Sequence, residues 1–239
     1  MVQNPEQAPA PLTHSARRIN RLAQMNGARS YLEIGVSEGS TFFGVGIAQK
    51  TAVDPRFRFD VAARRAPGQE FHAIPSDAFF TMPEHKARRF DVIFLDGLHT
   101  FEQTFRDFCA LSGNAHDDTI WIIDDVYPID VFSALRDPKA AASYRKETGR
   151  PGASWHGDVY KVVLAIHDFF PNFCLRTFSA GGNRQTVLIR RPRIDFKPLL
   201  GNLEAISRAD YFWMRENEGF FGMLPEAELY DWAAQTLAR

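Results

Sequence analysis

Four short apolar segments of this chain each end in an acidic residue. They occupy residues 31–33, 51–54, 91–96 and 121–125, and the last of them ends in two consecutive aspartates. Apolar segments of this length are typical of strands that are buried on both faces, as in a parallel sheet covered by helices. The carboxyl ends of parallel strands meet at one edge, where open α/β sheets bind their ligands. We therefore expect five carboxylates along one edge, suited to hydroxyls, amines or a metal cation rather than to phosphate.

The other segments complete an α/β pattern. After the last helix of this pattern, two short strands separated by glycines indicate a hairpin. Such an order of elements predicts a doubly wound, Rossmann-like, mostly parallel sheet with one antiparallel edge strand, helices on both faces and a helical C-terminal extension. Strands are expected at 29–34, 51–54, 70–74, 90–95, 119–123, 172–178 and 184–189, and helices at 13–26, 40–49, 76–80, 101–111 and 158–170.

The composition excludes several classes of function. Of the 239 residues, 45% are hydrophobic and 24% charged, and the formal net charge of −1 gives no general attraction to nucleic acid. No apolar stretch approaches the roughly 20 residues of a membrane span. The first residues lack the apolar core of a secretory signal, and the two cysteines have no metal-type spacing. We expect a cytoplasmic protein with no nucleic-acid partner and no membrane span.

Three parts of the chain differ in character. Residues 1–12 are proline-rich and are predicted to be a disordered tail, residues 13–191 form the α/β domain, and residues 192–239 form a helical, aromatic-rich extension. This extension packs on its own domain or provides a contact between copies in a homo-oligomer. Residues 126–155 have little periodicity and are expected to form a lid or binding loop. Five basic residues in that loop indicate either an acidic or phosphorylated acceptor or a role in solubility alone: Arg136, Lys139, Arg145, Lys146 and Arg150.

Residues 33–39, with the sequence EIGVSEG, join an expected strand to an expected helix. Glycines at 35 and 39 suit a turn at which the backbone comes close to a ligand. A dinucleotide-binding turn would have the form GxGxxG, but Ser37 takes the second glycine position and Glu33 would repel a pyrophosphate. Glu33 can instead accept from a cationic amino group, and Asp54 can accept from two ribose hydroxyls. These features indicate S-adenosylmethionine rather than NAD, the alternative being a tight turn with no ligand.

The same turn resembles the first motif of the class I S-adenosylmethionine-dependent methyltransferases, acid-x-Gly-x-x-x-Gly. The resemblance implies that residues 13–191 are the S-adenosylmethionine-binding domain of an enzyme of the EC 2.1.1 class. It implies that Glu33 lies near the methionine moiety, that Asp54 binds the ribose and that Thr41 binds the methionine carboxylate. Contacts with the adenine are implied for Ser76 and Asp77. The predicted cofactor-binding residues are Glu33, Gly35, Ser37, Gly39, Thr41, Asp54, Ser76, Asp77 and Asp96.

Acidic residues follow two strands that are expected to be neighbours. Asp96 follows the strand at 90–95, and Asp124 and Asp125 follow the strand at 119–123. Three carboxylates so close together raise one another's pKa unless a cation lies between them. All-oxygen ligation suits Mg²⁺ or Mn²⁺, so Asp96, Asp124 and Asp125 are a predicted metal site. His99 follows Asp96 by three residues, and an imidazole can act as a base near neutral pH.

This arrangement resembles the metal-dependent O-methyltransferases of the catechol and macrolide-sugar types. In the catechol type a basic residue three positions after the strand acid removes the substrate proton, which implies this role for His99. Residues 94–102 (FLDGLHTFE) and 155–161 (WHGDVYK) are similar to a subgroup of small bacterial methyltransferases often found beside sugar-modifying enzymes. The resemblance covers residues 28–191. It implies O-methylation of a hydroxyl on a small molecule or sugar, with S-adenosylmethionine and Mg²⁺ or Mn²⁺ as cofactors.

Each assignment has an alternative. Asp96 would cap the following helix or bond the glycine turn without a metal, and His99 would only orient the substrate. Asp158 would cap its own helix or touch the substrate. For the whole chain the alternatives are a non-catalytic cofactor-binding or interaction protein, and a metal-independent methyltransferase that acts on a carboxylate or an amine. A nicotinamide dehydrogenase is disfavoured by Glu33 and Ser37.

Overall fold

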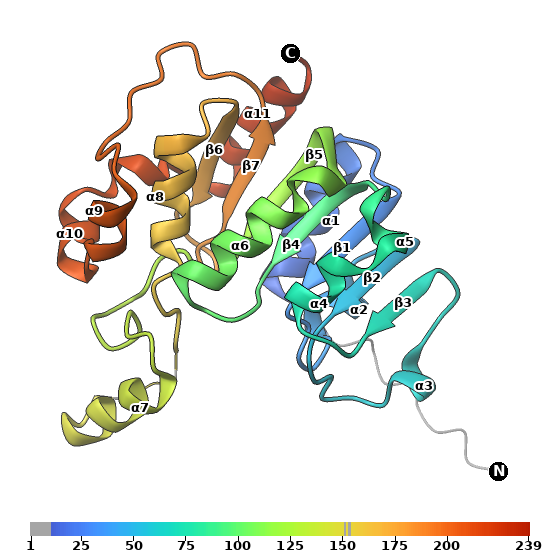
Figure 1. Cartoon of the computed structure of the whole chain (residues 1–239), viewed down its shortest axis with the longest axis horizontal. Coiled ribbons are helices and arrows are strands. Elements are labelled where there is room, and N and C mark those ends of the chain that lie inside the picture. Colours follow the sequence, from blue (N-terminus) through green and yellow to red (C-terminus); the bar gives the residue numbers. More distant parts are fainter. Residues whose placement is uncertain (1–10, 151, 153) are drawn as a thin grey trace.

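The computed structural model describes residues 11–150, 152 and 154–239, so most of the predicted tail at 1–12 lies outside the described residues. In the described part of the chain, eight strands form one mostly parallel sheet with helices on both faces (Figure 1). The strand order is β3-β2-β1-β4-β5-β7-β6-β8, and the predicted fold class is confirmed. The strands are β1 Ser30–Ile34, β2 Gln49–Val53, β3 Gln69–His72, β4 Phe90–Leu95, β5 Ala115–Ile123, β6 Phe173–Phe178, β7 Thr186–Arg190 and β8 Met223–Leu224.

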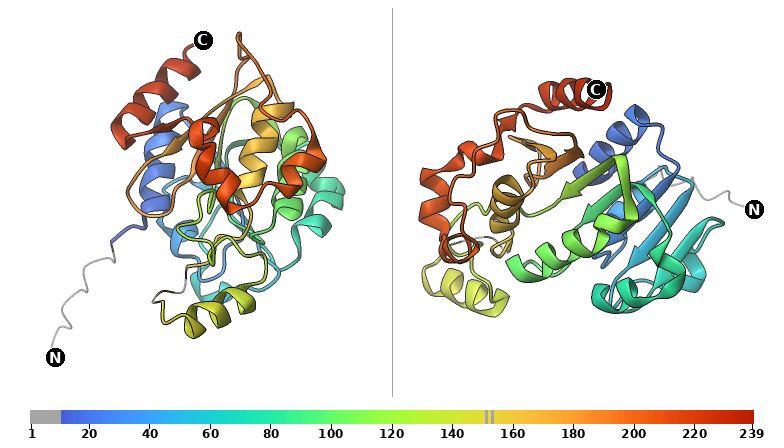
Figure 2. Two further views of the ribbon diagram at one scale, coloured as in Figure 1. Left: turned by 90° about the vertical axis from the view of Figure 1, so that its left-hand side faces the viewer. Right: turned by 45° about the horizontal axis from the view of Figure 1, so that its top comes forward.

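Two groups of helices cover the two faces of the sheet (Figure 2). The helices α1 His14–Met25, α2 Ser40–Gly44 and α11 Glu226–Leu237 pack on one face, and the core of the other face includes α4 Ser76–Thr81, α6 Phe101–Leu111, α8 Tyr160–Phe169, α9 Leu203–Arg208 and α10 Tyr211–Glu216. The remaining helices are α3 Val61–Arg64, α5 Pro83–Lys86, α7 Pro138–Glu147 and the 3-10 turns η1 Ser112–Asn114 and η2 Glu218–Phe221. None of the described helices is long and apolar enough to cross a membrane.

The central strand β4 shows why the sheet has one register. Val92 and Phe94 are buried in the core beneath α1, and Ile93 and Leu95 are buried in the core beneath α6. Each fully buried side chain of this size contributes about 1.5–3 kcal/mol relative to exposure. A shift of one residue would exchange the two faces, so packing on both sides fixes the position of Asp96 at the carboxyl edge of the sheet.

The antiparallel strand was predicted at the edge of the sheet, but it lies two places inside that edge. β7 pairs antiparallel with both β5 and β6, so it is not an edge strand. The tight turn that follows β6 folds β7 back into the space between β5 and β6, which gives it two paired neighbours. The edge is instead formed by the two-residue strand β8, which pairs in parallel with β6.

Two further segments differ from the sequence prediction. The helix predicted at 40–49 ends at Gly44, because Gly44 and Gly46 disfavour helix and β2 begins at Gln49. The predicted lid at 126–155 contains α7. This helix begins with two standard signals, since the Asp137 side chain accepts from the backbone N–H of Lys139 and Pro138 occupies the first helical position.

Candidate active site

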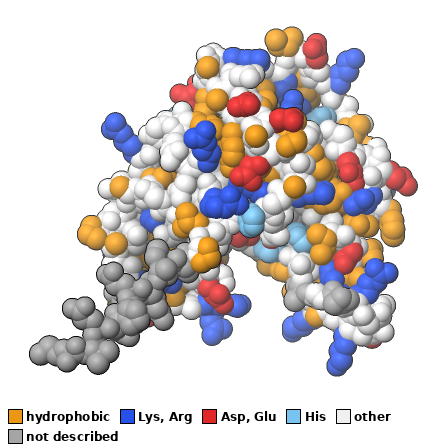
Figure 3. Space-filling model, turned by 180° about the vertical axis from the view of Figure 1, so that it is seen from behind, with side chains coloured by type: hydrophobic (Ala, Val, Ile, Leu, Met, Phe, Trp, Pro, Cys, Tyr) orange, Lys and Arg blue, Asp and Glu red, His pale blue; other side chains and the backbone are white. Residues whose placement is uncertain are grey.

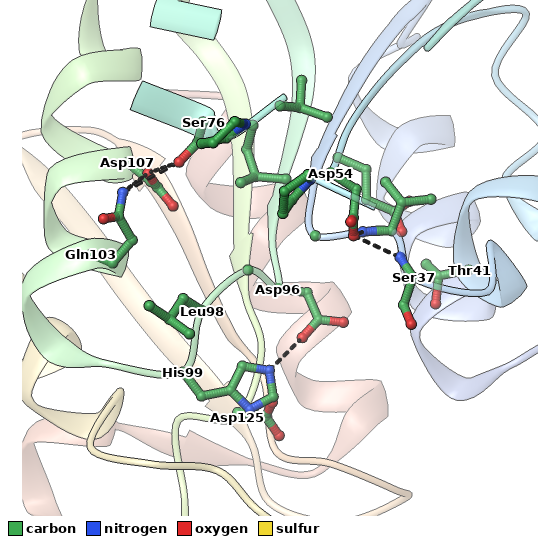
Figure 4. A pocket seen from close by; sticks show the side chains of 18 of the residues that line it. Ser37, Thr41, Asp54, Ser76, Asp96, Leu98, His99, Gln103, Asp107 and Asp125 are labelled. Atoms are coloured by element: carbon green, nitrogen blue, oxygen red, sulfur yellow. Dashed lines mark hydrogen bonds and ion pairs between the residues drawn. The ribbon is translucent and has the colours of Figure 1, made fainter. Parts of the chain in front are cut away.

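A cavity of about 810 Å³ opens at the carboxyl edge of the sheet (Figure 4). Its walls come from the glycine turn after β1, the end of β2, the start of α4, the loop between β4 and α6, and segments around 125, 154–156 and 183. Figure 3 shows the molecule deeply hollowed, with histidine side chains at the inner end of the hollow. Of the sequence-predicted residues, the cavity wall includes Glu33, Gly35, Ser37, Thr41, Asp54, Ser76, Asp77, Asp96, His99 and Asp125.

The glycine turn is held in shape by Asp54. One carboxylate oxygen, Oδ2, accepts from the backbone N–H groups of Val36 and Ser37, each at 2.8 Å, and Oδ1 accepts from Arg56 N at 2.7 Å. A side chain at Gly35 has no space, because a Cβ there would lie 1.9 Å from the carbonyl oxygen of Asp96. Gly39 does not line the cavity in the described structure, and it precedes α2 with a left-handed φ of 77°.

Glu33 lies buried at the end of β1, where the glycine turn begins. The Tyr31 hydroxyl donates to Glu33 Oε2 at 2.6 Å. Burial raises the pKa of Glu33 well above its usual range, and the nearby Asp96 raises it further. Thr41 also lines the cavity, with its Oγ1 3.3 Å from Thr13 Oγ1 on the segment before α1.

On another wall of the cavity, two residues of α6 complete a polar cluster that the sequence analysis missed. The Ser76 hydroxyl donates to Asp107 Oδ1 at 2.7 Å, and Gln103 Nε2 donates to the same oxygen at 3.0 Å. Burial raises the pKa of Asp107. Gln103 and Asp107 are four residues apart, and such a polar pair on a helix otherwise marked by Phe101, Phe105 and Phe108 is the signal that points to them.

Asp96, His99 and Asp125 converge in another part of the cavity, next to the start of α6. His99 Nε2 lies 3.0 Å from Asp125 Oδ2 and 3.5 Å from Asp96 Oδ1. The other ring nitrogen, Nδ1, lies 3.0 Å from the carbonyl oxygen of Trp155, whose indole stacks on the imidazole. Burial alone would lower the pKa of His99, but hydrogen bonds to Asp125 and Asp96 raise it to about 11. Burial also raises the pKa of Asp96 to about 6.

Asp124, the third predicted metal ligand, points elsewhere. Its Oδ2 accepts from Gln185 Nε2 at 3.1 Å, and its Oδ1 accepts from the backbone N–H of Asp125 at 2.8 Å. Gln185 in turn accepts from the buried Arg18 of α1 at 3.1 Å. Among the described residues, the cavity wall includes Asp125 but not Asp124. Burial raises the pKa of Asp124 well above its usual range.

The segment 155–161 packs tightly against the loop that contains His99. A Cβ at Gly157 would lie 1.7 Å from the carbonyl oxygen of His99. Asp158 Oδ1 accepts from the backbone N–H of Phe101 at 2.7 Å, so Asp158 caps α6 rather than its own helix. Lys161 Nζ lies 3.1 Å from Asp158 Oδ2 and also donates to the carbonyl oxygen of Ser207 at 2.7 Å.

Two of the basic residues of the predicted lid are paired with acids. Arg136 contacts Glu102 at 2.6 Å, and Arg145 contacts Asp130 at 2.8 Å. Lys146 and Arg150 line a smaller cavity of about 340 Å³, which shares Ser154 and Trp155 with the main cavity.

Comparison with known proteins agrees with this geometry. Residues 32–126, which include the glycine turn, Asp54 and the acidic cluster, match a family model described as a methyltransferase domain. The expected resemblance to methyltransferases is thereby confirmed over residues 32–126. No curated protein matches the chain.

Several solved structures have a fold similar to that of this chain. An O-methyltransferase from Bacillus cereus in complex with SAH is 15% identical, with a TM-score of 0.52, and the alignment covers 77% of this chain and 84% of that one. A putative caffeoyl-CoA O-methyltransferase from Staphylococcus aureus is 14% identical, with a TM-score of 0.52 and coverage of 76% and 85%. The cofactor-bound protein Rv0187 from MTB is 15% identical, with a TM-score of 0.53 and coverage of 79% and 85%.

Proposed function

We propose that the protein transfers a methyl group from S-adenosylmethionine to a hydroxyl oxygen of a small molecule or sugar. The observation that carries this proposal is a single cavity with two chemically different ends. One end has the glycine turn, Glu33 and Asp54, and the other has the convergent group Asp96, His99 and Asp125. The proposed working domain is 13–191, the extension is 192–239, and the proposed location is the cytoplasm.

At the first end, each residue has a proposed contact with the methyl donor. Asp54 keeps about one acceptor position for a ribose hydroxyl after accepting from three backbone N–H groups, since a carboxylate has about four such positions. Glu33 faces the amino group of the methionine moiety, and Thr41 faces its carboxylate. Ser76 and Asp77 face the adenine, with Ser76 held in place by its hydrogen bond to Asp107.

At the second end, the chain must orient the acceptor and manage its proton. S-adenosylmethionine supplies a methyl group on a positively charged sulfur. As the acceptor oxygen forms its bond to the methyl carbon, the sulfur–carbon bond breaks, and the hydroxyl proton passes to a base; neutral His99 is the candidate for this role when its Nε2 does not bind a cation. Positioning of the two reactants in one closed cavity supplies much of the acceleration in such a displacement.

A divalent cation fits this end of the cavity. Carboxylate oxygens of Asp96 and Asp125 and a ring nitrogen of His99 lie within 4.8 Å of one another, the one such group among the described residues. Mg²⁺ or Mn²⁺ held there would lower the pKa of the acceptor hydroxyl. Asp124, whose carboxylate is bonded to Gln185, would orient Asp125 rather than bind the ion.

One observation favours a second candidate, methyl transfer without a metal. The imidazole of His99 already lies between Asp96 and Asp125, and as a cation it would balance their charge. Loss of activity in EDTA, restored by a divalent cation, would support the metal-assisted reaction. Full activity in EDTA would support the second candidate.

Titration calorimetry with S-adenosylhomocysteine tests the methyltransferase proposal. We expect micromolar binding that falls at least about tenfold in Asp54→Asn, because the amide lacks one of the two oxygens that hold the turn. Asp60→Asn is the matched control, since Asp60 caps the short helix α3 outside the cavity. A panel of hydroxylated acceptors, assayed by transfer of a labelled methyl group, then identifies the acceptor. No binding of S-adenosylhomocysteine by the wild-type protein would contradict the proposal.

A further inference from the structure

The orientation of His99 leaves one of its nitrogens facing two acceptors. Nδ1 lies 3.0 Å from the Trp155 carbonyl, which can only accept, so Nδ1 carries a hydrogen. In the neutral ring Nε2 then carries a lone pair and no hydrogen. It faces Asp125 Oδ2 at 3.0 Å and Asp96 Oδ1 at 3.5 Å, and both carboxylates can only accept when ionised. A cation, either a proton or a metal ion, must therefore lie among these three atoms.

Their spacing matches that of ligands around one metal ion. Neighbouring ligands at right angles are about 3 Å apart when each bond is about 2.1 Å long, as is usual for nitrogen and oxygen ligands of small divalent cations. The second nitrogen of the imidazole also has the hydrogen bond that is usual for a metal-binding histidine. Such a histidine donates its other N–H to a carbonyl or carboxylate, and here that partner is the Trp155 carbonyl.

The surroundings of Asp125 point the same way. Asn183 Nδ2 donates to Asp125 Oδ1 at 2.9 Å, which fixes the carboxylate with Oδ2 toward His99. His156 lines the cavity with its Nε2 3.7 Å from Asp125 Oδ1. The His156 side chain is 97% buried, and its Nδ1 has no hydrogen-bond partner in the described structure. A second imidazole thus lies next to the group with an unused nitrogen.

We propose that Asp96, His99 and Asp125 form a mixed nitrogen–oxygen site for a first-row transition-metal dication, with His99 Nε2 as a direct ligand. Imidazole ligation favours Zn²⁺ or Fe²⁺ over Mg²⁺, which prefers oxygen ligands alone. This site replaces the predicted all-oxygen set of Asp96, Asp124 and Asp125, because the Asp124 carboxylate accepts a hydrogen bond from Gln185. The inference rests on the proposed function only in that the site faces the acceptor end of the cavity, and it makes His99 a metal ligand in place of the base proposed for the reaction without a metal.

Mn²⁺ is the probe, and electron spin-echo spectroscopy of the full-length protein is the readout. We expect one bound Mn²⁺ per chain with modulation from a directly bonded imidazole nitrogen. His99→Gln should remove that modulation and weaken Mn²⁺ binding at least about tenfold. His116→Gln is the matched control, because His116 lies at the amino end of β5, at the opposite edge of the sheet. Asp124→Asn should keep the nitrogen signal and an affinity within a few-fold of wild type.

Three outcomes would overturn the inference. Mn²⁺ bound without nitrogen modulation, and with equal affinity in His99→Gln, would mean an all-oxygen site. Loss of Mn²⁺ binding in Asp124→Asn with an unaltered circular dichroism spectrum would restore the predicted set. No binding of Mn²⁺ or Zn²⁺ by the wild-type protein would mean that a proton occupies the position. Parallel titration with S-adenosylhomocysteine separates these results from failure of the proposed function, because cofactor binding is measured without a metal.

Discussion

At the scale of single residues, two glycines allow loops from distant parts of the chain to meet at the site. Gly35 lies against the backbone of Asp96, and Gly157 lies against the backbone of His99. Both have positive φ, which a residue with a side chain adopts at a cost of about 1–2 kcal/mol. The close approach at Gly157 is what sets the Trp155 carbonyl against the His99 ring.

Gly157→Ala should therefore destabilise the protein by more than the cost of placing alanine at a positive φ. We expect a loss of about 3 kcal/mol or more in the free energy of unfolding, because the new Cβ would lie 1.7 Å from the His99 carbonyl oxygen and one of the two loops must move. Gly149→Ala is a matched control. Gly149 has a φ of 62°, against 59° at Gly157, and no atom within 4 Å of the added Cβ.

Urea unfolding measures both variants, and the Gly149 variant should lose only about 1–2 kcal/mol. The Gly157 variant should also weaken Mn²⁺ binding, since the loop of His99 moves. Equal losses in the two variants would show that the contact between Gly157 and His99 is not tight in solution.

Residue types at the ends of strands were predictable, but the direction of each side chain was not. Asp96 and Asp125 follow buried strands, and the structure brings them together as expected. Asp124 was expected with them. Its direction depends on Gln185, which comes from β7, and on Arg18 from α1, and no local pattern in the sequence records such long-range partners.

At the scale of elements, Asp168 ties the end of α8 to the start of the C-terminal extension. Its carboxylate accepts from the backbone N–H groups of Leu199, Leu200 and Gly201 at 2.7–2.8 Å. Burial by itself would raise the pKa of Asp168, but these bonds and the one from His167 lower it below its ordinary value. The ionised carboxylate therefore stabilises the folded protein.

Asp168→Asn should cost about 2 kcal/mol or more at pH 7, because a carboxylate with three N–H donors becomes an amide with one oxygen. The folded-state pKa is depressed, so this contribution is fully present above the unfolded pKa of about 3.9 and is lost as pH falls through the folded pKa. The difference from wild type should shrink when unfolding is measured from pH 6 down to pH 3. Asp231→Asn, on the exposed side of α11, is the control. A difference that stays constant with pH would contradict the assignment.

Elements with strong periodicity were predicted, and those that depend on tertiary partners were missed. β4 has the predicted bounds, and α6 contains the apolar positions from which a helix was predicted, because their apolar spacing is regular. α7 was missed although Asp137-Pro138 is a recognisable start signal, because the residues after it lack an apolar stripe. β8 has two residues and exists through its pairing with β6, which sequence periodicity cannot reveal.

At the scale of the whole molecule, the C-terminal extension shares the cores of the α/β domain. α11 contributes Leu229 and Ala233 to the core that also contains Ile19 of α1 and Phe94 of β4. α9 and α10 contribute Ile206 and Met214 to the core on the other face. Because both cores cross the predicted boundary at residue 191, we expect the chain to unfold as one unit.

Leu229→Ala tests this expectation. Leu229 is fully buried, so its truncation should lower the free energy of unfolding by about 2–5 kcal/mol. If the extension and the α/β domain unfold together, fluorescence and far-ultraviolet circular dichroism should show one shared transition, shifted to lower urea in the variant. Leu203→Ala on α9 is the control, because Leu203 is 48% exposed and its truncation should change stability by about 0.5 kcal/mol or less. A separate early transition in Leu229→Ala, with binding of S-adenosylhomocysteine retained after it, would mean that the extension is an independent unit. The hydrogen bonds from residues 199–201 to Asp168 argue against that result, because they join the end of α8 to the extension across the boundary.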